Sequence, residues 1–194
     1  MTTRKLGPKK AGRETRYPRG LTESKRPPLE SPEESPVQSP ARTPIAPPHL
    51  VSRHAMRVRF FETDLMGIVH HATYLTYFEA GRVDWLHKRG VAYDAWTKAG
   101  VHLPVVETQL RYRKPAKFDD RLVVVTAPAQ VTRVTVRFDY EVLREADEPG
   151  GQETLLCEGH TLLACVGHDL APKRLPQWVV DTFASAEHPE SAWK

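Results

Sequence analysis

The chain has 194 residues and a formal net charge of +4, a length that accommodates one domain of ordinary size with a tail. Residues 1–48 hold ten Lys/Arg and five Asp/Glu, so their net charge of +5 leaves −1 for residues 49–194. A nearly neutral domain argues against nucleic acid as its main ligand, because such binding rests on neutralising phosphates.

Residues 1–48 are predicted to be a disordered, basic, proline-rich tail, followed by a single domain over residues 49–194. The tail holds 10 of the 17 prolines and almost no large apolar side chains, so it cannot bury enough surface to offset the entropy of ordering. A solvated arm is favoured over weak attraction to RNA, DNA or an anionic membrane.

The sequence favours a cytoplasmic protein. No apolar run approaches the roughly 18 residues of a transmembrane segment, and the first residues lack the apolar core of a secretory signal. Cys157 and Cys165 fall in one expected strand, about 26 Å apart, which is too far for a disulfide between them. Unpaired cysteines suit a reducing compartment.

The elements begin with a strand over residues 56–60, where apolar and basic side chains alternate. A long helix is expected over residues 74–90, which contain no proline and carry one apolar stripe at helical spacing. The stripe consists of Tyr74, Phe78, Gly81 and Trp85.

Strands dominate the rest of the domain, after a short helix at residues 92–100. Residues 134–143 alternate between apolar and polar side chains, and residues 153–167 are apolar enough for a strand buried on both faces. Residues 175–185 are expected to form a C-terminal helix. Two further strands are expected at residues 101–115 and 121–133.

The order of the elements predicts the fold class. Short turns between consecutive strands require antiparallel neighbours. One long helix against one antiparallel sheet is an α+β domain, with about five strands wrapped around a central helix.

The corner before the long helix, ETDLMGIVHHATY, gathers the candidate chemistry. Asp64 is suited to act as a general base or as a nucleophile. The helix start at Ala72, Thr73 and Tyr74 offers backbone N–H groups and the positive end of the helix dipole to a developing oxyanion. Gly67 lets the loop turn back toward the helix. No metal or organic cofactor is required.

The stretch FFETDLMGIVHHATYLTYFEAGRVDWL resembles hotdog-fold acyl-CoA thioesterases of the 4-hydroxybenzoyl-CoA thioesterase type, most closely the branch that includes the Tol–Pal-associated thioesterase. The resemblance continues in RYRKPAKFDD and CEGHTLLACVGHDLAPKRLP. Thr73 stands where the family more often has Asn, and both residues can cap a helix. The resemblance implies a hotdog fold and hydrolysis of acyl-CoA to a free acid and CoA.

Carried over from the family, the catalytic carboxylate falls on Asp64 and the assisting residue on His71. His70 is interpreted as structural or substrate-lining, because only one histidine of the pair matches the motif. Glu79 is the alternative carboxylate, since other hotdog branches place a catalytic Glu on this helix, but an ion pair with Arg82 is the favoured interpretation. A zinc site from these histidines is disfavoured, because adjacent histidines seldom converge on one metal.

Coenzyme A carries phosphates, so basic residues are expected at the outer end of its tunnel. The candidates are Arg111, Arg113, Lys114, Lys117 and Arg133. The resemblance also implies a homodimer or homotetramer, with the site across a subunit interface. The acyl group, aliphatic or aromatic, and the carrier, coenzyme A or acyl carrier protein, stay open.

Two other functions compete with thioester hydrolysis. Hotdog enoyl-thioester hydratases carry an Asp–x4–His dyad, but here five and six residues separate Asp64 from His70 and His71, so the dyad is absent. A non-catalytic binding module for acyl-CoA or acyl carrier protein is the second alternative, and the retained Asp64 argues against it.

Overall fold

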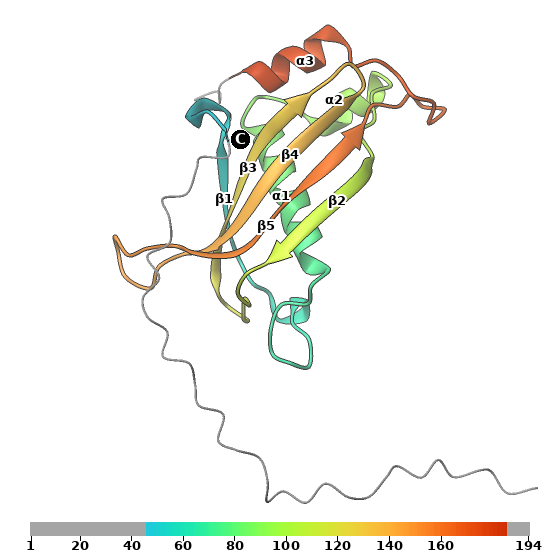
Figure 1. The fold of residues 1–194 in the computed structure, drawn as a ribbon. Helices are drawn as coiled ribbons and strands as arrows, with labels where there is room; N and C mark the ends of the chain where they lie inside the picture. Colours follow the sequence, from blue (N-terminus) through green and yellow to red (C-terminus); the bar gives the residue numbers. More distant parts are fainter. Residues whose placement is uncertain (1–45, 186–194) are drawn as a thin grey trace, which may run out of the picture. The chain divides into compact units, whose positions relative to one another are not determined.

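The structure, a computed structural model, describes residues 46–185 (Figure 1). The tail predicted at residues 1–48 lies almost wholly outside the described residues, and its last residue begins a short 3₁₀ helix, Pro48–Leu50. None of the helices in residues 46–185 is long and apolar enough to cross a membrane.

A five-stranded antiparallel sheet forms one layer of the domain, in the order β1-β3-β4-β5-β2 (Figure 1). A three-residue turn joins β3 to β4 and a nine-residue loop joins β4 to β5, while β1 and β2 form the two edges. The α+β class with five antiparallel strands is therefore confirmed. The strands are β1 (Ser52–Arg57), β2 (Val105–Tyr112), β3 (Arg121–Val131), β4 (Thr135–Arg144) and β5 (Thr154–Ala164).

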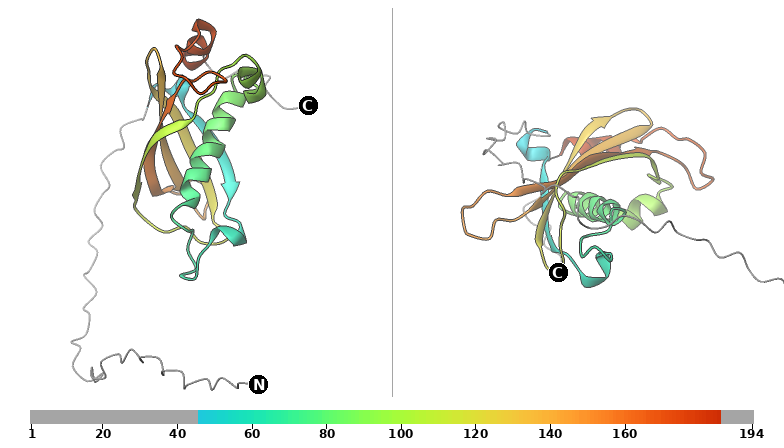
Figure 2. Two further views of the ribbon diagram at one scale, coloured as in Figure 1. Left: turned by 90° about the vertical axis from the view of Figure 1, so that its right-hand side faces the viewer. Right: turned by 60° about the horizontal axis from the view of Figure 1, so that its bottom comes forward.

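The long helix α1 (Thr73–His87) lies against one face of the sheet, which curves around it (Figure 2). The whole predicted stripe is buried, as the 3.6-residue period requires. Phe78 stacks on Tyr140 of β4 with ring centroids 4.3 Å apart. A Cβ atom at Gly81 would lie only 2.4 Å from the Thr126 hydroxyl oxygen, so the glycine lets α1 approach β3 closely. This is the hotdog arrangement implied by the resemblance.

Two short helices, α2 (Tyr93–Lys98) and α3 (Gln177–Ala184), follow the expected segments and supply aromatic residues near the C-terminal half of α1. Phe183 of α3 stacks on Trp85 with centroids 5.6 Å apart, and Trp96 of α2 meets Phe183 edge to face. These rings close one end of the core.

Arg89, just past α1, is buried and joins three parts of the chain. Its guanidinium lies 3.7 Å from the centre of the Trp85 ring and donates hydrogen bonds to the backbone oxygens of Trp85, His49 and Ser185. The segments near the two ends of the described chain are therefore both held to the Arg89 side chain, just past α1.

The first strand differs from its prediction: it spans Ser52–Arg57, not residues 56–60. The alternation of MRVRF resembles a strand, but Phe60–Glu62 forms a 3₁₀ helix in which Arg59 and Glu62 cap each other reciprocally. The capping turn ends the strand and leaves Phe60 exposed.

Side-chain alternation in β4 is as expected for Val136, Phe138, Tyr140 and Val142, which are all buried. Val134 lies outside the strand and is exposed.

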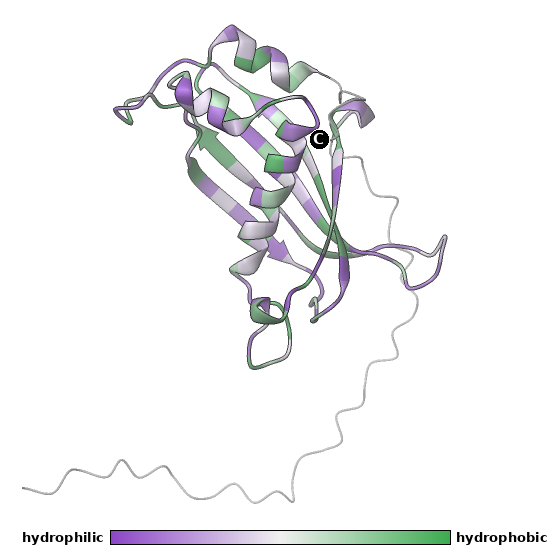
Figure 3. Cartoon of the chain, turned by 180° about the vertical axis from the view of Figure 1, so that it is seen from behind, coloured by the Kyte–Doolittle hydropathy of each residue, from purple (hydrophilic) through white to green (hydrophobic). Residues whose placement is uncertain are grey.

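The prediction that β5 is buried on both faces is wrong in part. Leu155 and Leu162 of β5 are only half-buried. The reason is that α1 covers one face of the sheet, while a small cluster of Val123, Val125 and Leu143 packs separately. Figure 3 shows the resulting mixture of apolar and hydrophilic residues along the strands. Cys157 and Cys165 are both free, as expected.

Candidate active site

The corner is a small closed loop rather than an open coil. Thr63 and Val69 form an isolated antiparallel bridge, and the Asp64 backbone nitrogen donates to the Ile68 oxygen at 2.9 Å. Gly67 has φ = +72°, a left-handed conformation that costs a glycine little. The loop therefore turns back as its glycine predicted, which places Asp64 near the start of α1.

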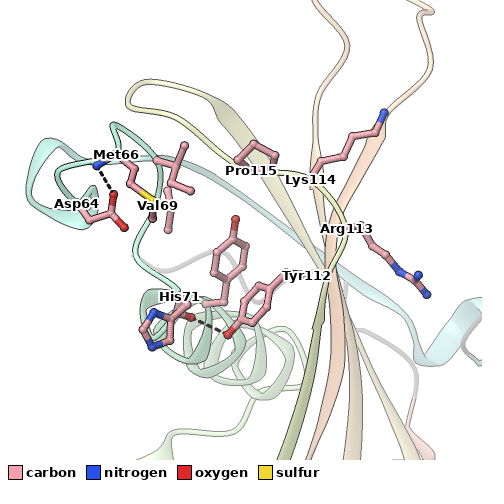
Figure 4. Close-up of a pocket in the computed structure, with 10 residues that line it drawn as sticks. Asp64, Met66, Val69, His71, Tyr112, Arg113, Lys114 and Pro115 are labelled. Carbon is pink, nitrogen blue, oxygen red and sulfur yellow. Dashed lines mark hydrogen bonds between the residues drawn. The ribbon is translucent and has the colours of Figure 1, made fainter. Parts of the chain in front are cut away.

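The Asp64 side chain is half-buried and held on one side only. Its Oδ1 atom accepts a hydrogen bond from the Met66 backbone nitrogen at 2.8 Å (Figure 4). This Asx-type turn fixes the carboxylate orientation, while the second oxygen has no hydrogen-bond partner among the described residues. A carboxylate with one free oxygen at a pocket wall is suited to attack a carbonyl or to take a proton from water.

The first turn of α1 has no side-chain cap. The Ala72 nitrogen donates to the His70 ring at 3.3 Å, and the Thr73 nitrogen donates to the His70 backbone oxygen at 2.9 Å. Among the hydrogen bonds of residues 46–185, the Tyr74 nitrogen has no acceptor. Of the three expected donors, Tyr74 is therefore the one whose N–H has no partner among the described residues.

The two histidines differ in what they do. His71 lines the pocket, and its backbone oxygen accepts a hydrogen bond from the Tyr112 hydroxyl at 3.0 Å (Figure 4). His70 does not line the pocket, and its ring accepts the Ala72 N–H, which agrees with a structural role. The two rings are in contact, with centroids 4.1 Å apart.

Asp64 and His71 line one pocket of about 340 Å³, shown in Figure 4. Tyr74 and Tyr112 form an edge-to-face pair on its wall, with centroids 5.3 Å apart. Burial raises the pKa of Tyr74 to about 12, so the phenol is neutral at physiological pH. The pocket is lined by Asp64, Met66, Ile68, Val69, His71, Tyr74, Tyr112, Arg113, Lys114 and Pro115.

The five basic candidates separate by location. Arg113 and Lys114 line the pocket, and Arg113 is paired with Glu158. Arg111 and Lys117 are near in sequence but do not line it. Arg133 lies in the β3–β4 turn, at the opposite end of the sheet from the corner (Figure 1). Arg133 therefore does not line the pocket of its own chain.

The expected ion pair of Glu79 and Arg82 does not form among the described residues, and that prediction was wrong. Arg82 instead donates a hydrogen bond to the Tyr140 hydroxyl at 3.2 Å, and this buried phenol is also hydrogen-bonded with the Thr161 hydroxyl at 2.8 Å. Glu79 is exposed and lines a separate hollow with His54, Asp84 and His87. The alternative carboxylate is thus in a different pocket from Asp64.

Within residues 46–185, no three His, Cys, Asp or Glu side chains gather closely enough to hold a metal ion. The zinc site from His70, His71 and Asp64 has no support in this geometry.

Two polar residues of the corner were missed by sequence reasoning. Glu62 is buried, and the Arg-x-x-Glu spacing of its capping interaction with Arg59 was the available signal. Tyr112 reaches His71 from β2, 41 residues away in the chain. Only the tertiary arrangement of β2 beside the start of α1 brings them together.

The fold and the pocket define a hotdog domain with an acidic corner at the start of its central helix. A sequence model of the thioesterase superfamily matches residues 66–150. The putative acyl-CoA thioesterase YneP of Bacillus subtilis is 36% identical over 98 residues, which cover 50% of this chain and 71% of that protein. The chain therefore belongs to the thioesterase superfamily, and this confirms the expected enzyme class, a thioester hydrolase.

Two further similarities extend the match. The acyl-CoA thioester hydrolase YbgC of Escherichia coli O157:H7 is 27% identical over 132 residues, which cover 68% of this chain and 94% of that protein. The crystal structure of DHNA-CoA thioesterase from Staphylococcus aureus has a TM-score of 0.61 and 30% identity, and covers 68% of this chain and 85% of that chain.

Proposed function

We propose that this protein is an acyl-CoA thioesterase that hydrolyses its substrate to a free acid and coenzyme A, with Asp64 as the catalytic carboxylate. The observation that carries the proposal is that Asp64 and Tyr74 line the same pocket. Asp64 presents a free carboxylate oxygen, and the Tyr74 N–H at the start of α1 has no acceptor. Thioester hydrolysis requires this pair of functions.

In the proposed mechanism, the thioester carbonyl oxygen accepts a hydrogen bond from the Tyr74 N–H, and the α1 dipole favours the negative charge that develops there. A donor of this kind contributes about 3 kcal/mol to the transition state. Asp64 then either takes a proton from an attacking water or attacks the carbonyl itself to form a mixed anhydride, which water hydrolyses. In both routes the C–S bond breaks and the CoA thiolate takes up a proton.

His71 is proposed to assist this chemistry as a polar residue of the same wall. The position of His71 is held through its backbone by the Tyr112 hydroxyl, which leaves its ring free to contact the ligand or its water. Met66, Ile68 and Val69 give the pocket apolar surface for the acyl group.

Coenzyme A is proposed as the carrier because Arg113 and Lys114 line the pocket and extend their charged ends away from Asp64 and His71 (Figure 4), where the phosphates of a bound ligand would need cations. Arg111 and Lys117 are proposed to contribute at longer range, through the local potential alone. Acyl carrier protein is the alternative carrier, and an acidic protein surface would meet the same cations. We also propose placement in the Tol–Pal-associated branch, on the resemblance carried by the corner and the first half of α1.

A homodimer, or a tetramer built from two dimers, is proposed from the edge strand β2. Seven of its eight residues are exposed, and among the strands of residues 46–185 β2 pairs with β5 alone. An edge with unpaired backbone groups on its outer side is suited to pairing with a second copy. Tyr112 and the pocket lie at one end of β2, so a paired copy would lie beside the site.

The test is the release of free thiol from a panel of short, long and aromatic acyl-CoAs. Thiol release by the wild type, lost in Asp64→Asn with acyl-CoA binding retained, supports the proposal. Binding of acyl-CoA without hydrolysis across the whole panel would identify a binding module instead. Undiminished turnover in Asp64→Asn would remove Asp64 from the mechanism.

A further inference from the structure

Glu62 is a buried carboxylate two residues before Asp64 that the proposed mechanism does not use. It is 3% exposed, and it does not line the pocket. Burying a carboxylate is costly unless its oxygens are fully hydrogen-bonded. The residues that satisfy Glu62 therefore show what this side chain holds in place.

Four donors converge on the two carboxylate oxygens. Oε1 accepts from the Arg59 guanidinium, at 2.9 Å from Nε and 2.6 Å from Nη2. Oε2 accepts from the Arg59 backbone nitrogen at 2.7 Å and from the Tyr77 hydroxyl at 2.9 Å. Tyr77 belongs to α1 and is fully buried. Burial and the bond to Glu62 raise the pKa of Tyr77 well above its usual range, so it remains a donor.

The Glu62 backbone also closes the base of the catalytic loop. Its oxygen accepts a hydrogen bond from the His70 nitrogen at 2.9 Å, next to the Thr63–Val69 bridge. The His70 oxygen in turn accepts from the Thr73 nitrogen at 2.9 Å, at the start of α1. One residue therefore anchors both ends of the segment that runs from Asp64 to the helix.

We infer that Glu62 is a positioning residue whose carboxylate, through Arg59 and Tyr77, fixes Asp64 relative to the Tyr74 N–H. This inference rests on the proposed thioesterase function. The carboxylate links the loop to the first turns of α1, and the two groups of the mechanism lie on either side of that link. A misplacement of about 1 Å between reacting groups can cost about 100-fold in rate.

Two variants break the link in different ways. Glu62→Gln replaces one acceptor oxygen with an NH2 group, which must face N–H donors of Arg59 or the Tyr77 hydroxyl. Tyr77→Phe removes only the hydrogen bond to α1 and keeps the Arg59 interactions. Glu153→Gln is the matched control, because Glu153 forms a surface ion pair with Arg53 away from the pocket.

The first measurement is kcat and KM for acyl-CoA, at a temperature where circular dichroism shows every variant to be folded. Glu62→Gln is expected to lower kcat at least 10-fold and Tyr77→Phe about 5-fold, with KM within about 3-fold of wild type. Glu153→Gln should match the wild type. A kcat within 2-fold of wild type in both Glu62→Gln and Tyr77→Phe overturns the inference.

A double-mutant cycle separates positioning from a general loss of structure. In the Asp64→Asn background, Glu62→Gln is expected to cost less than about 2-fold in kcat, because the group that it positions is already disabled. An equal loss in both backgrounds would mean that Glu62 acts independently of Asp64, which contradicts the inference.

Amide hydrogen exchange provides a readout that does not depend on turnover. Glu62→Gln and Tyr77→Phe are expected to speed exchange at least 10-fold at the His70 and Gly67 amides, with β4 unchanged. Unchanged exchange at these amides overturns the positioning role even if the wild type proves inactive. Inactivity of the wild type on every acyl-CoA would instead refute the proposed function alone.

Discussion

The two ends of α1 are built in opposite ways. The N-terminal end has no side-chain cap, carries the unpaired Tyr74 N–H and adjoins an exposed loop. The C-terminal end is closed by stacked aromatic rings and by Arg89, whose guanidinium satisfies three backbone oxygens. Cations at this end, Lys88 and Arg89, also complement the negative pole of the helix dipole.

The difference shows how one helix can supply both stability and chemistry. The hydrogen-bonded C-terminal end holds α1 against the sheet, so the N-terminal end can keep one backbone N–H without an acceptor. An unpaired backbone N–H costs free energy, which the apolar cluster at the far end offsets. Variants at the N-terminal end should therefore change turnover, and variants at the C-terminal end should change stability.

The largest effect is expected for Asp64→Asn. The amide keeps an oxygen that can accept the Met66 N–H, so the loop should retain its shape, but the general base or nucleophile is lost. We expect kcat to fall by about 1,000-fold and the free energy of unfolding to change by less than about 0.5 kcal/mol. Thiol release and urea denaturation measure the two quantities. A clear fall in the free energy of unfolding of Asp64→Asn would contradict the assignment of turnover to the N-terminal end of α1 and of stability to the C-terminal end.

Arg89→Met tests the opposite end. Three backbone oxygens lose their buried donor, and the Trp85 ring loses its cation. We expect the free energy of unfolding to fall by about 3 kcal/mol, since a buried group left unsatisfied costs about 1–3 kcal/mol. Below the melting temperature, kcat and KM should match the wild type. A fall in kcat without loss of stability would show that this end also shapes the active site.

Gly81→Ala tests the contact between α1 and the sheet, midway between the two ends. The new Cβ atom would lie 2.4 Å from Thr126 Oγ1 and 2.7 Å from a Val124 methyl carbon. We expect a net destabilisation of about 1–2 kcal/mol, because overpacking outweighs the better helix propensity of alanine. Thermal unfolding measures the change. In a Thr126→Ser background the loss should be unchanged, since the hydroxyl remains, whereas Thr126→Ala should reduce it.

The smallest effect is expected for the contribution of the ionised Asp84 carboxylate to the free energy of unfolding, which depends on pH. Burial acts to raise its pKa, but hydrogen bonds from His54 and Lys88 outweigh burial and lower it to about 2. The folded pKa lies below the unfolded pKa of about 3.9, so the stabilisation is present above about pH 4 and is lost as the pH falls toward 2.

Because Asp84 is partly exposed, this stabilisation should amount to about 1 kcal/mol at pH 6. Urea denaturation of wild type and Asp84→Asn between pH 6 and pH 2 measures it. The difference between the two proteins should shrink as the pH falls. A constant difference would assign the effect to hydrogen bonding rather than to charge.

Much of the fold follows from periodicity in the sequence. The stripe of α1 and the alternation of β4 each repeat at the period of their element, and both were predicted. The first strand was misplaced, because the reciprocal capping of Arg59 and Glu62 ends it early. The Glu79–Arg82 pair failed because Arg82 reaches a buried phenol on β4, a contact that helix spacing cannot foresee.

The parts of the site that lie close together in the sequence could be predicted. Asp64, Gly67 and the helix start lie within one short segment, so the sequence places them together. Arg133 follows the far end of β3 from Arg121, so the length of this strand separates it from Arg113, a separation that the choice of basic candidates did not use. Tyr112 required the position of β2 beside the start of α1. The roles of Asp64 and His71 in turnover remain predictions for the variants above.

The three hydrogen bonds of Arg89 have a consequence for protein engineering. Through one guanidinium, the chain near His49 and the chain near Ser185 are held beside each other. A short linker could therefore join these two points, and new termini could be opened in the exposed turn at Pro149 and Gly150. Such a circular permutant would keep the catalytic loop and α1 in one uninterrupted segment.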